Sequence, residues 1–243
     1  MIQQKLLKPW PLRLFLKKIS SFVITITGVL IVILSGLSYY GNSVGDMVVS
    51  IDNIINRSLS LSETGGFAAS DASTMLAARG INDIRDSTFY YIPEDIHEGE
   101  GLKSDKKGNM YFAYTFFLKN ASDVSVSYSA TISIDRQTKN IDKAVRIMII
   151  VDDEDPVIWA RPRSDGNPET LDEDESAVKK GYSTKPFTED VFSVVNQTVM
   201  ERDQIQKYTV VIWIEGWDAD CTDAIVGGNL EISMTFKIIE GDE

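Results

Sequence analysis

The strongest constraint on this chain is an apolar stretch near its N-terminus that contains no charged residue. The stretch extends from Ile19 to Gly45, and its centre, Phe22 to Leu37, is dense in isoleucine, valine and leucine. A helix of about 20 apolar residues is long enough to cross a bilayer. Residues 19–45 are therefore predicted to form a transmembrane or signal helix, with the membrane as their partner.

The charges on either side of this stretch predict its orientation. Residues 1–18 contain five basic residues and no acidic one, whereas Asp46 and Asp52 follow the stretch. Basic flanks remain on the cytoplasmic side of a membrane. We therefore expect a basic cytoplasmic leader at residues 1–18, a single membrane pass, and a C-terminal part outside the cell membrane.

Whether the apolar stretch is retained is left open by the sequence. Signal peptides have an apolar run of about 7–15 residues followed by a small-residue cleavage site. The run here is longer, and only weak candidate sites such as Gly36-Leu37-Ser38 follow it. A retained signal-anchor is the favoured interpretation, and secretion after cleavage near residues 38–45 is the alternative.

The net charge of −12 hides an uneven distribution. The chain after residue 18 holds all 36 acidic residues but only 19 of the 24 basic ones, a net charge of −17. Binding to nucleic acid depends on basic side chains that neutralise phosphates. This composition therefore excludes nucleic acid as an expected partner.

The part after residue 45 has the pattern of a β protein. From Val124 to Ile134 apolar residues alternate with serine and threonine, the period of a half-buried strand. Further strands are predicted at residues 58–62, 110–120, 144–151, 156–160, 208–214 and 229–239. Many strands and few helices favour an antiparallel β-sandwich. We expect a connector at residues 46–58 and one extracellular sandwich domain at residues 59–243.

Two segments of this domain are expected to differ from plain strands. Ser70, Arg79 and Gly80 are placed as the N-cap, last turn and C′ residue of a short helix, one of the one or two expected. Residues 152–180 are rich in acids and prolines. They are predicted to form a β-hairpin with a long acidic loop excursion.

The sequence offers little for catalysis. His97 is the single histidine, and no H-E-x-x-H motif is present. Catalytic zinc normally takes three protein ligands, and the common serine and cysteine nucleophiles need a histidine base. We therefore expect no enzymatic activity and no catalytic residue or organic cofactor.

The loop "DADCTD" is the one candidate for a metal site. It places Asp218, Asp220 and Asp223 close together, and calcium prefers six to eight oxygen ligands. The competing interpretation is a connection between the last two strands with solvated acids, and this one is favoured. Cys221 in the same loop is either a half-buried small residue or an exposed thiol that could pair between chains.

Three stretches, taken in order, resemble the TasA/camelysin family of exported bacterial proteins. They are "SLSLSETGGF" at residues 58–67, "YFAYTFFLKNASDVSVSYSATISI" at residues 111–134, and "GGNLEISMTF" at residues 227–236. The resemblance implies a jelly-roll-like sandwich on the surface of a Gram-positive bacterium. It also implies kinship with biofilm-matrix fibre subunits that give an N-terminal strand to the next subunit. The protease activity described for camelysins does not carry over, because this chain lacks a zinc-ligand set.

The expected function follows from the anchor, the β pattern and this resemblance. It is a non-enzymatic cell-surface or extracellular-matrix protein that assembles into or anchors fibres by β-strand addition. If the leader is retained, the segment from Met47 to Leu61 is not free to leave, and a tethered surface protein or filament base is expected instead. The alternative is a membrane-tethered module that binds calcium or another ligand.

Overall fold

The computed structural model describes residues 47–52, 58–68, 70–80, 84–104, 110–163, 166 and 183–239. The predicted leader at residues 1–18 and the predicted membrane helix at residues 19–45 lie outside these ranges. Residues 44–243 belong to one compact unit. Within the described ranges, no helix combines the length and apolar character needed to span a membrane.

The described chain forms two sheets. Sheet A has the order β11-β7-β13-β1-β3, with β1 at Met47–Ile51, β3 at Met75–Ala78, β7 at Val126–Gln137, β11 at Val191–Met200 and β13 at Leu230–Ile239. Sheet B has the order β10-β9-β8-β12-β6-β2, with β2 at Leu59–Ser62, β6 at Phe112–Asn120, β8 at Val145–Val151, β9 at Val157–Ala160, β10 at Ser183–Pro186 and β12 at Ile205–Glu215. Two short strands extend sheet B: β4 (Asp86–Ser87) pairs with β12, and β5 (Gly101–Ser104) pairs with β6.

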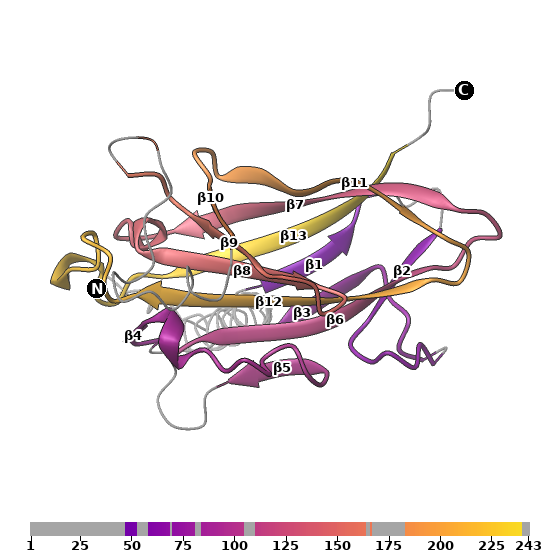
Figure 1. Cartoon of the computed structure of the whole chain (residues 1–243), viewed down its shortest axis with the longest axis horizontal. Coiled ribbons are helices and arrows are strands. Elements are labelled where there is room, and N and C mark those ends of the chain that lie inside the picture. Colours follow the sequence, from indigo (N-terminus) through magenta and orange to yellow (C-terminus); the bar gives the residue numbers. More distant parts are fainter. Residues whose placement is uncertain are drawn as a thin grey trace, which may run out of the picture. The chain divides into compact units, whose positions relative to one another are not determined.

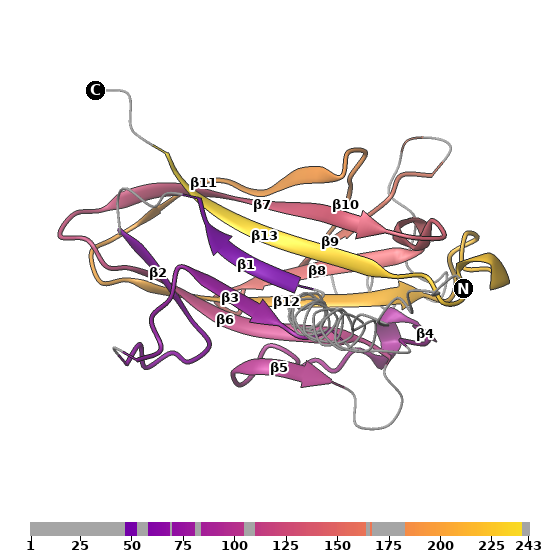
Figure 2. The same cartoon turned by 180° about the vertical axis from the view of Figure 1, so that it is seen from behind.

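The two sheets pack face to face as a sandwich (Figures 1 and 2). Most neighbouring strands are antiparallel, while β1 with β13, β4 with β12 and β9 with β10 are parallel. The prediction of a mainly β, antiparallel-rich sandwich is thus confirmed. Strands are present in every range where the sequence predicted one.

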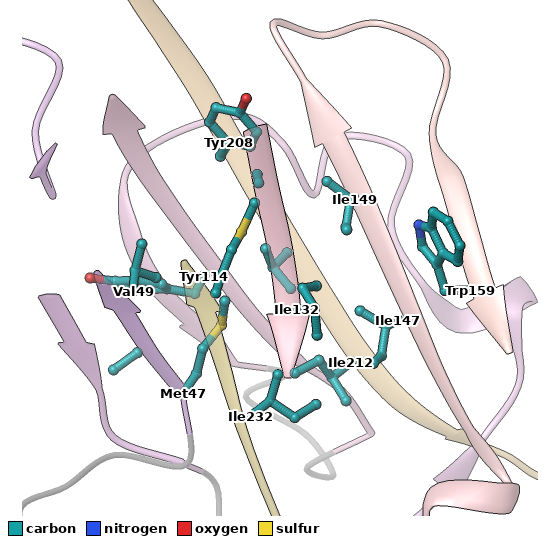
Figure 3. Packing of buried hydrophobic residues seen from close by; sticks show 14 of the residues in the cluster. Met47, Val49, Tyr114, Ile132, Ile147, Ile149, Trp159, Tyr208, Ile212 and Ile232 are labelled. Atoms are coloured by element: carbon teal, nitrogen blue, oxygen red, sulfur yellow. The ribbon is translucent and has the colours of Figure 1, made fainter. Parts of the chain in front are cut away.

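Sheet A explains the alternating sequence pattern. In β7, Tyr128, Ala130 and Ile132 are fully buried, and the serines and threonines between them are half-buried on the opposite face. A strand places successive side chains on opposite faces, so one face of sheet A forms a core and the other is hydroxyl-rich. Figure 3 shows Ile132 in the same apolar core as Met47 and Ile147, which come from different sheets. We call this the inner core.

Sheet B is apolar on both faces. In β12, Tyr208, Val210 and Ile212 face the inner core, whereas Val211 and Trp213 belong to a separate buried cluster. This outer core comprises Phe89, Ile92, Ile96, Tyr111, Ala113, Met148, Ile150, Ile158, Val211 and Trp213. The segment from residue 84 to residue 104, which includes the 3-10 turn η1 (Phe89–Tyr91), covers it and is called the outer layer.

The predicted helix at Ser70–Gly80 is wrong. Residues Met75–Ala78 are strand β3, which pairs antiparallel with β1 from Met47↔Ala78 to Ser50↔Met75. Local cap residues favour a helix only weakly, and hydrogen bonding to a neighbouring strand overrides them. The described residues contain no α-helix and only the 3-10 turns η1, η2 (Ile141–Lys143) and η3 (Asp223–Ile225).

The predicted connector and acidic excursion are resolved in part. Strand β1 lies inside the range 46–58, so part of the connector belongs to the sandwich. The β8–β9 hairpin is confirmed at the start of the range 152–180, with Ile149 opposite Val157. Most of the remainder of that range lies outside the described residues.

Candidate functional site

The first strand of the described chain occupies an interior position in sheet A. β1 runs parallel to β13, from Met47↔Ile232 to Ile51↔Phe236, and antiparallel to β3 on its other side. Both edges of β1 are therefore hydrogen bonded. Next to its end, the Asp52 amide donates to the Phe236 carbonyl at 2.8 Å. β1 is the single strand between β13 and β3, and we call this position in sheet A the β1 slot.

The apolar face of β1 fills this slot. Met47 and Val49 are completely buried, and Ile51 is 8% exposed. Burying one such side chain stabilises a fold by roughly 1.5–3 kcal/mol. The opposite face carries Val48 and Ser50, and the Ser50 hydroxyl lies 3.4 Å from that of Thr235 on β13. The burial of these three side chains of β1 thus stabilises the fold by several kcal/mol in all.

The loop between β12 and β13 holds the three predicted metal-ligand candidates. Asp220 and Asp223 are exposed, but Asp218 is 4% exposed, and its Oδ2 lies 2.8 Å from Nη2 of Arg146. The expectation that the acids of this loop are solvated is therefore wrong for Asp218. The described residues contain no group of three or more histidines, cysteines or acids that could hold a metal ion. Calcium binding by the three aspartates stays a prediction, and the guanidinium already neutralises one of them.

Sequence reasoning missed two residues of this region. Arg146 is fully buried at the second position of β8, and Glu215 is fully buried at the end of β12. Glu215 accepts hydrogen bonds from the Trp213 indole at 3.0 Å and from the Trp217 amide at 3.4 Å. Burying a charge costs several kcal/mol unless it is paired. The signal in the sequence that could have indicated both residues is a charged side chain inside or at the end of an apolar strand.

These contacts fix the start of the β12–β13 loop. The Asp220 amide donates to Oδ1 of Asp218 at 2.8 Å, and the Gly216 amide donates to the Ser87 carbonyl at 2.6 Å. Oδ2 of the same Asp218 side chain forms the ion pair with Arg146. The arrangement is that of a structural anchor, since the charges of Arg146 and Asp218 neutralise each other and are withdrawn from solvent.

Cys221 is half-buried, in agreement with one of the two readings of the sequence. Burial raises the pKa of its thiol, and the nearby carboxylates of Asp86, Asp218 and Glu215 raise it further against the opposing effect of Arg146. The thiolate is the reactive form of cysteine. A raised pKa therefore makes this thiol a weak nucleophile at neutral pH.

No family model matches this chain, and neither does any curated protein or solved structure. The resemblance to the TasA/camelysin family accordingly stays a prediction.

Proposed function

We propose that this chain is a non-enzymatic, exported cell-surface or extracellular-matrix protein that assembles into or anchors fibres by β-strand addition. The observation that supports the proposal is the position of β1. It is the first strand of the compact unit, yet it lies between two other strands with Met47 and Val49 completely buried. The proposed fold in full is a jelly-roll-like sandwich preceded by a membrane or signal helix at residues 19–45.

A strand in this position suits exchange between copies. When a neighbouring molecule supplies β1, the slot between β13 and β3 regains the same hydrogen bonds and the same buried side chains. The exchange therefore costs little beyond the entropy of association. An empty slot would expose unpaired backbone groups on β13 and β3, and such strand edges recruit a further strand.

The fate of the segment at residues 19–45 decides which form of assembly occurs. A retained segment ties β1 to the membrane, because Met47 follows Gly45 by only two positions. The molecule is then a tethered surface protein or the base of a filament. Cleavage near residues 38–45 would release β1 and produce a secreted fibre subunit.

The test uses two single-cysteine variants of the full chain, Val48→Cys and Ser233→Cys, each with Cys221→Ser. Val48 and Ser233 are direct partners in the β1–β13 register. Both are half-buried on the face of sheet A that points away from the inner core. The two variants are co-expressed with tags of different size. Strand exchange predicts a covalent heterodimer on non-reducing gels.

The matched control combines Val48→Cys with Ser129→Cys, because Ser129 lies on β7 and pairs with Lys237 of β13, not with β1. This pair should give no heterodimer. Equal cross-linking of both pairs would indicate random collisions. Efficient cross-linking only within one chain carrying both Val48→Cys and Ser233→Cys would show that β1 stays in its own molecule, and strand addition through β1 would be rejected.

A further inference from the structure

A cavity of about 160 Å³ opens between the outer layer and the β8–β9 hairpin. Its apolar floor consists of Phe89, Ile92, Ile96, Met148 and Ile150, each at most 6% exposed. All five side chains belong to the outer core, which packs on the face of sheet B that points away from sheet A. The floor is therefore a fixed part of the fold.

The rim of the cavity is acidic. It carries Glu94 from the outer layer and Asp153, Glu154 and Asp155 from the β8–β9 turn. Asp153 has nearby partners, since its Oδ1 lies 2.5 Å from Nζ of Lys207 and 3.8 Å from Nε2 of His97. Within the described part of the chain, Glu154 and Asp155 have no basic partner. The rim thus retains an excess of negative charge over an apolar floor.

This combination restricts the chemistry of an occupant. Calcium needs six to eight oxygen ligands, and the described residues offer no cluster of three or more candidate metal ligands. An anion would be repelled by the carboxylates of Glu154 and Asp155 on the rim. The volume is below the roughly 300–1,000 Å³ of sites for drug-sized ligands, so the occupant is small.

We propose that this cavity binds an alkylammonium group, with its carbon chain on the apolar floor and its charged nitrogen at the rim beside Glu154 and Asp155. The group can belong to a free small amine or to a lysine side chain of a polypeptide. Either source buries a short aliphatic stem and keeps the ammonium in contact with carboxylates, as amphipathic side chains do elsewhere. The cavity lies on the face of sheet B that points away from sheet A, whereas the β1 slot is part of sheet A. Binding in the cavity is therefore independent of strand exchange.

The test measures binding to the full-length protein in non-ionic detergent by saturation-transfer NMR. Three probes separate the two components of the site: n-butylammonium chloride, 1-butanol of similar shape without charge, and calcium chloride with charge but no apolar body. We expect saturable millimolar binding of n-butylammonium, at least about tenfold weaker binding of 1-butanol, and no displacement by equimolar calcium. Equal binding of 1-butanol, or displacement by calcium, would overturn the proposal.

Variants locate the binding. Glu154→Gln combined with Asp155→Asn should weaken n-butylammonium binding about fivefold, the size expected for two exposed charge contacts. The matched control, Asp220→Asn combined with Asp223→Asn, removes the same charge from the exposed β12–β13 loop and should leave binding unchanged. Equal weakening in both variants would mean a general electrostatic attraction and no site.

A fourth probe distinguishes the two sources of the alkylammonium group. The peptide Gly-Lys-Gly with blocked ends presents the same alkylammonium chain on a backbone. Tighter binding of the peptide than of n-butylammonium indicates a polypeptide lysine as the natural occupant, and weaker binding indicates a free amine. Failure of both n-butylammonium and the peptide to bind would reject the alkylammonium site.

Discussion

The inner and outer cores share sheet B but are closed in different ways. The inner core lies between two sheets of long strands, and pairs such as β7 with β13 extend from Leu230↔Gln137 to Ile239↔Ser127. The outer core is closed by a segment with only the short strands β4 and β5 and the turn η1. A sheet that is apolar on both faces must be packed on both. Sheet A packs on one face of sheet B, and the outer layer packs on the other.

The polar groups of the two cores also differ. Tyr128 of sheet A donates its hydroxyl hydrogen to Gln206 of sheet B at 2.5 Å and contacts the hydroxyl of Tyr208, so uncharged groups join the two sheets. The outer layer lies beside charged groups, since the ion pair of Arg146 with Asp218 lies at the end of β12 where β4 is paired. The buried tyrosines of the inner core are sensitive to alkaline pH, whereas the ion pair beside the outer core is sensitive to loss of one charged partner. The stability of the two cores can therefore be measured separately.

The largest effect is expected from Trp213→Ala in the outer core. Trp213 is completely buried, its ring lies 6.0 Å from that of Phe89, and its indole donates to Glu215. Loss of a buried aromatic side chain costs roughly 3–5 kcal/mol in the free energy of unfolding. Urea denaturation of the full chain would measure this loss.

The matched control is Thr131→Ala on the half-buried outer face of sheet A, where we expect a change within about 0.5 kcal/mol. This face has no covering layer among the described residues. Similar costs for Trp213→Ala and Thr131→Ala would contradict the distinction between a covered face of sheet B and an open face of sheet A.

A somewhat smaller loss is expected from Asp218→Leu. Removing one partner of a buried ion pair costs about 3 kcal/mol, because the other charge loses its counter-charge in a dry environment. The double variant Arg146→Met with Asp218→Leu should recover most of that loss. A double-mutant cycle on unfolding free energies measures the coupling, and additive single effects would show that the 2.8 Å ion pair contributes nothing specific.

The smallest effect of a single residue is expected from Tyr128 of the inner core, at alkaline pH. Burial raises the pKa of Tyr128 to about 12, with the hydrogen bond to Tyr208 opposing that shift, and burial also raises the pKa of Tyr114 and Tyr208. The folded state then keeps protons that the unfolded chain releases near pH 10. Stability is complete below pH 10 and falls as pH rises towards 12, by about 2–3 kcal/mol for Tyr128 alone.

Unfolding measured in urea at pH 8, 10 and 11 checks this slope. Tyr128→Phe should reduce the loss above pH 10, whereas Trp213→Ala should leave the slope unchanged because it alters the other core. A slope that disappears in Trp213→Ala would mean that the two cores do not respond independently to pH.

The sequence predicted the strands well because the two patterns that indicate a strand, alternation and a continuous apolar run, depend only on neighbouring residues. The alternation in β7 and β13 identifies a one-sided strand, and the continuous apolar run of β12 identifies a strand as well. Such a run does not indicate whether Val211 and Trp213 or the alternate residues Val210 and Ile212 face a core. Both sets are buried. The cover on the second face comes from the outer layer, whose sequence has no regular period that could have indicated its position.

The failures arose where distant residues determine the outcome. Met75–Ala78 is a strand because β1 lies beside it, which the cap residues at Ser70 and Gly80 could not indicate. Asp218 is buried because Arg146 lies on a strand far from it in sequence. A charge inside an apolar run can be recognised in a sequence, but the identity of its partner depends on strand order.

The parallel pairing of β1 with β13 has a consequence for the order of folding. Ser50 and Thr235 are separated by 185 positions, so the first strand of the compact unit receives one of its two neighbours only when the last strand has been synthesised. Until then β1 can pair only with β3. Contacts over such sequence separations form slowly. One edge of β1 therefore stays without its native partner until β13 has been synthesised, and β13 then joins β1 to β7.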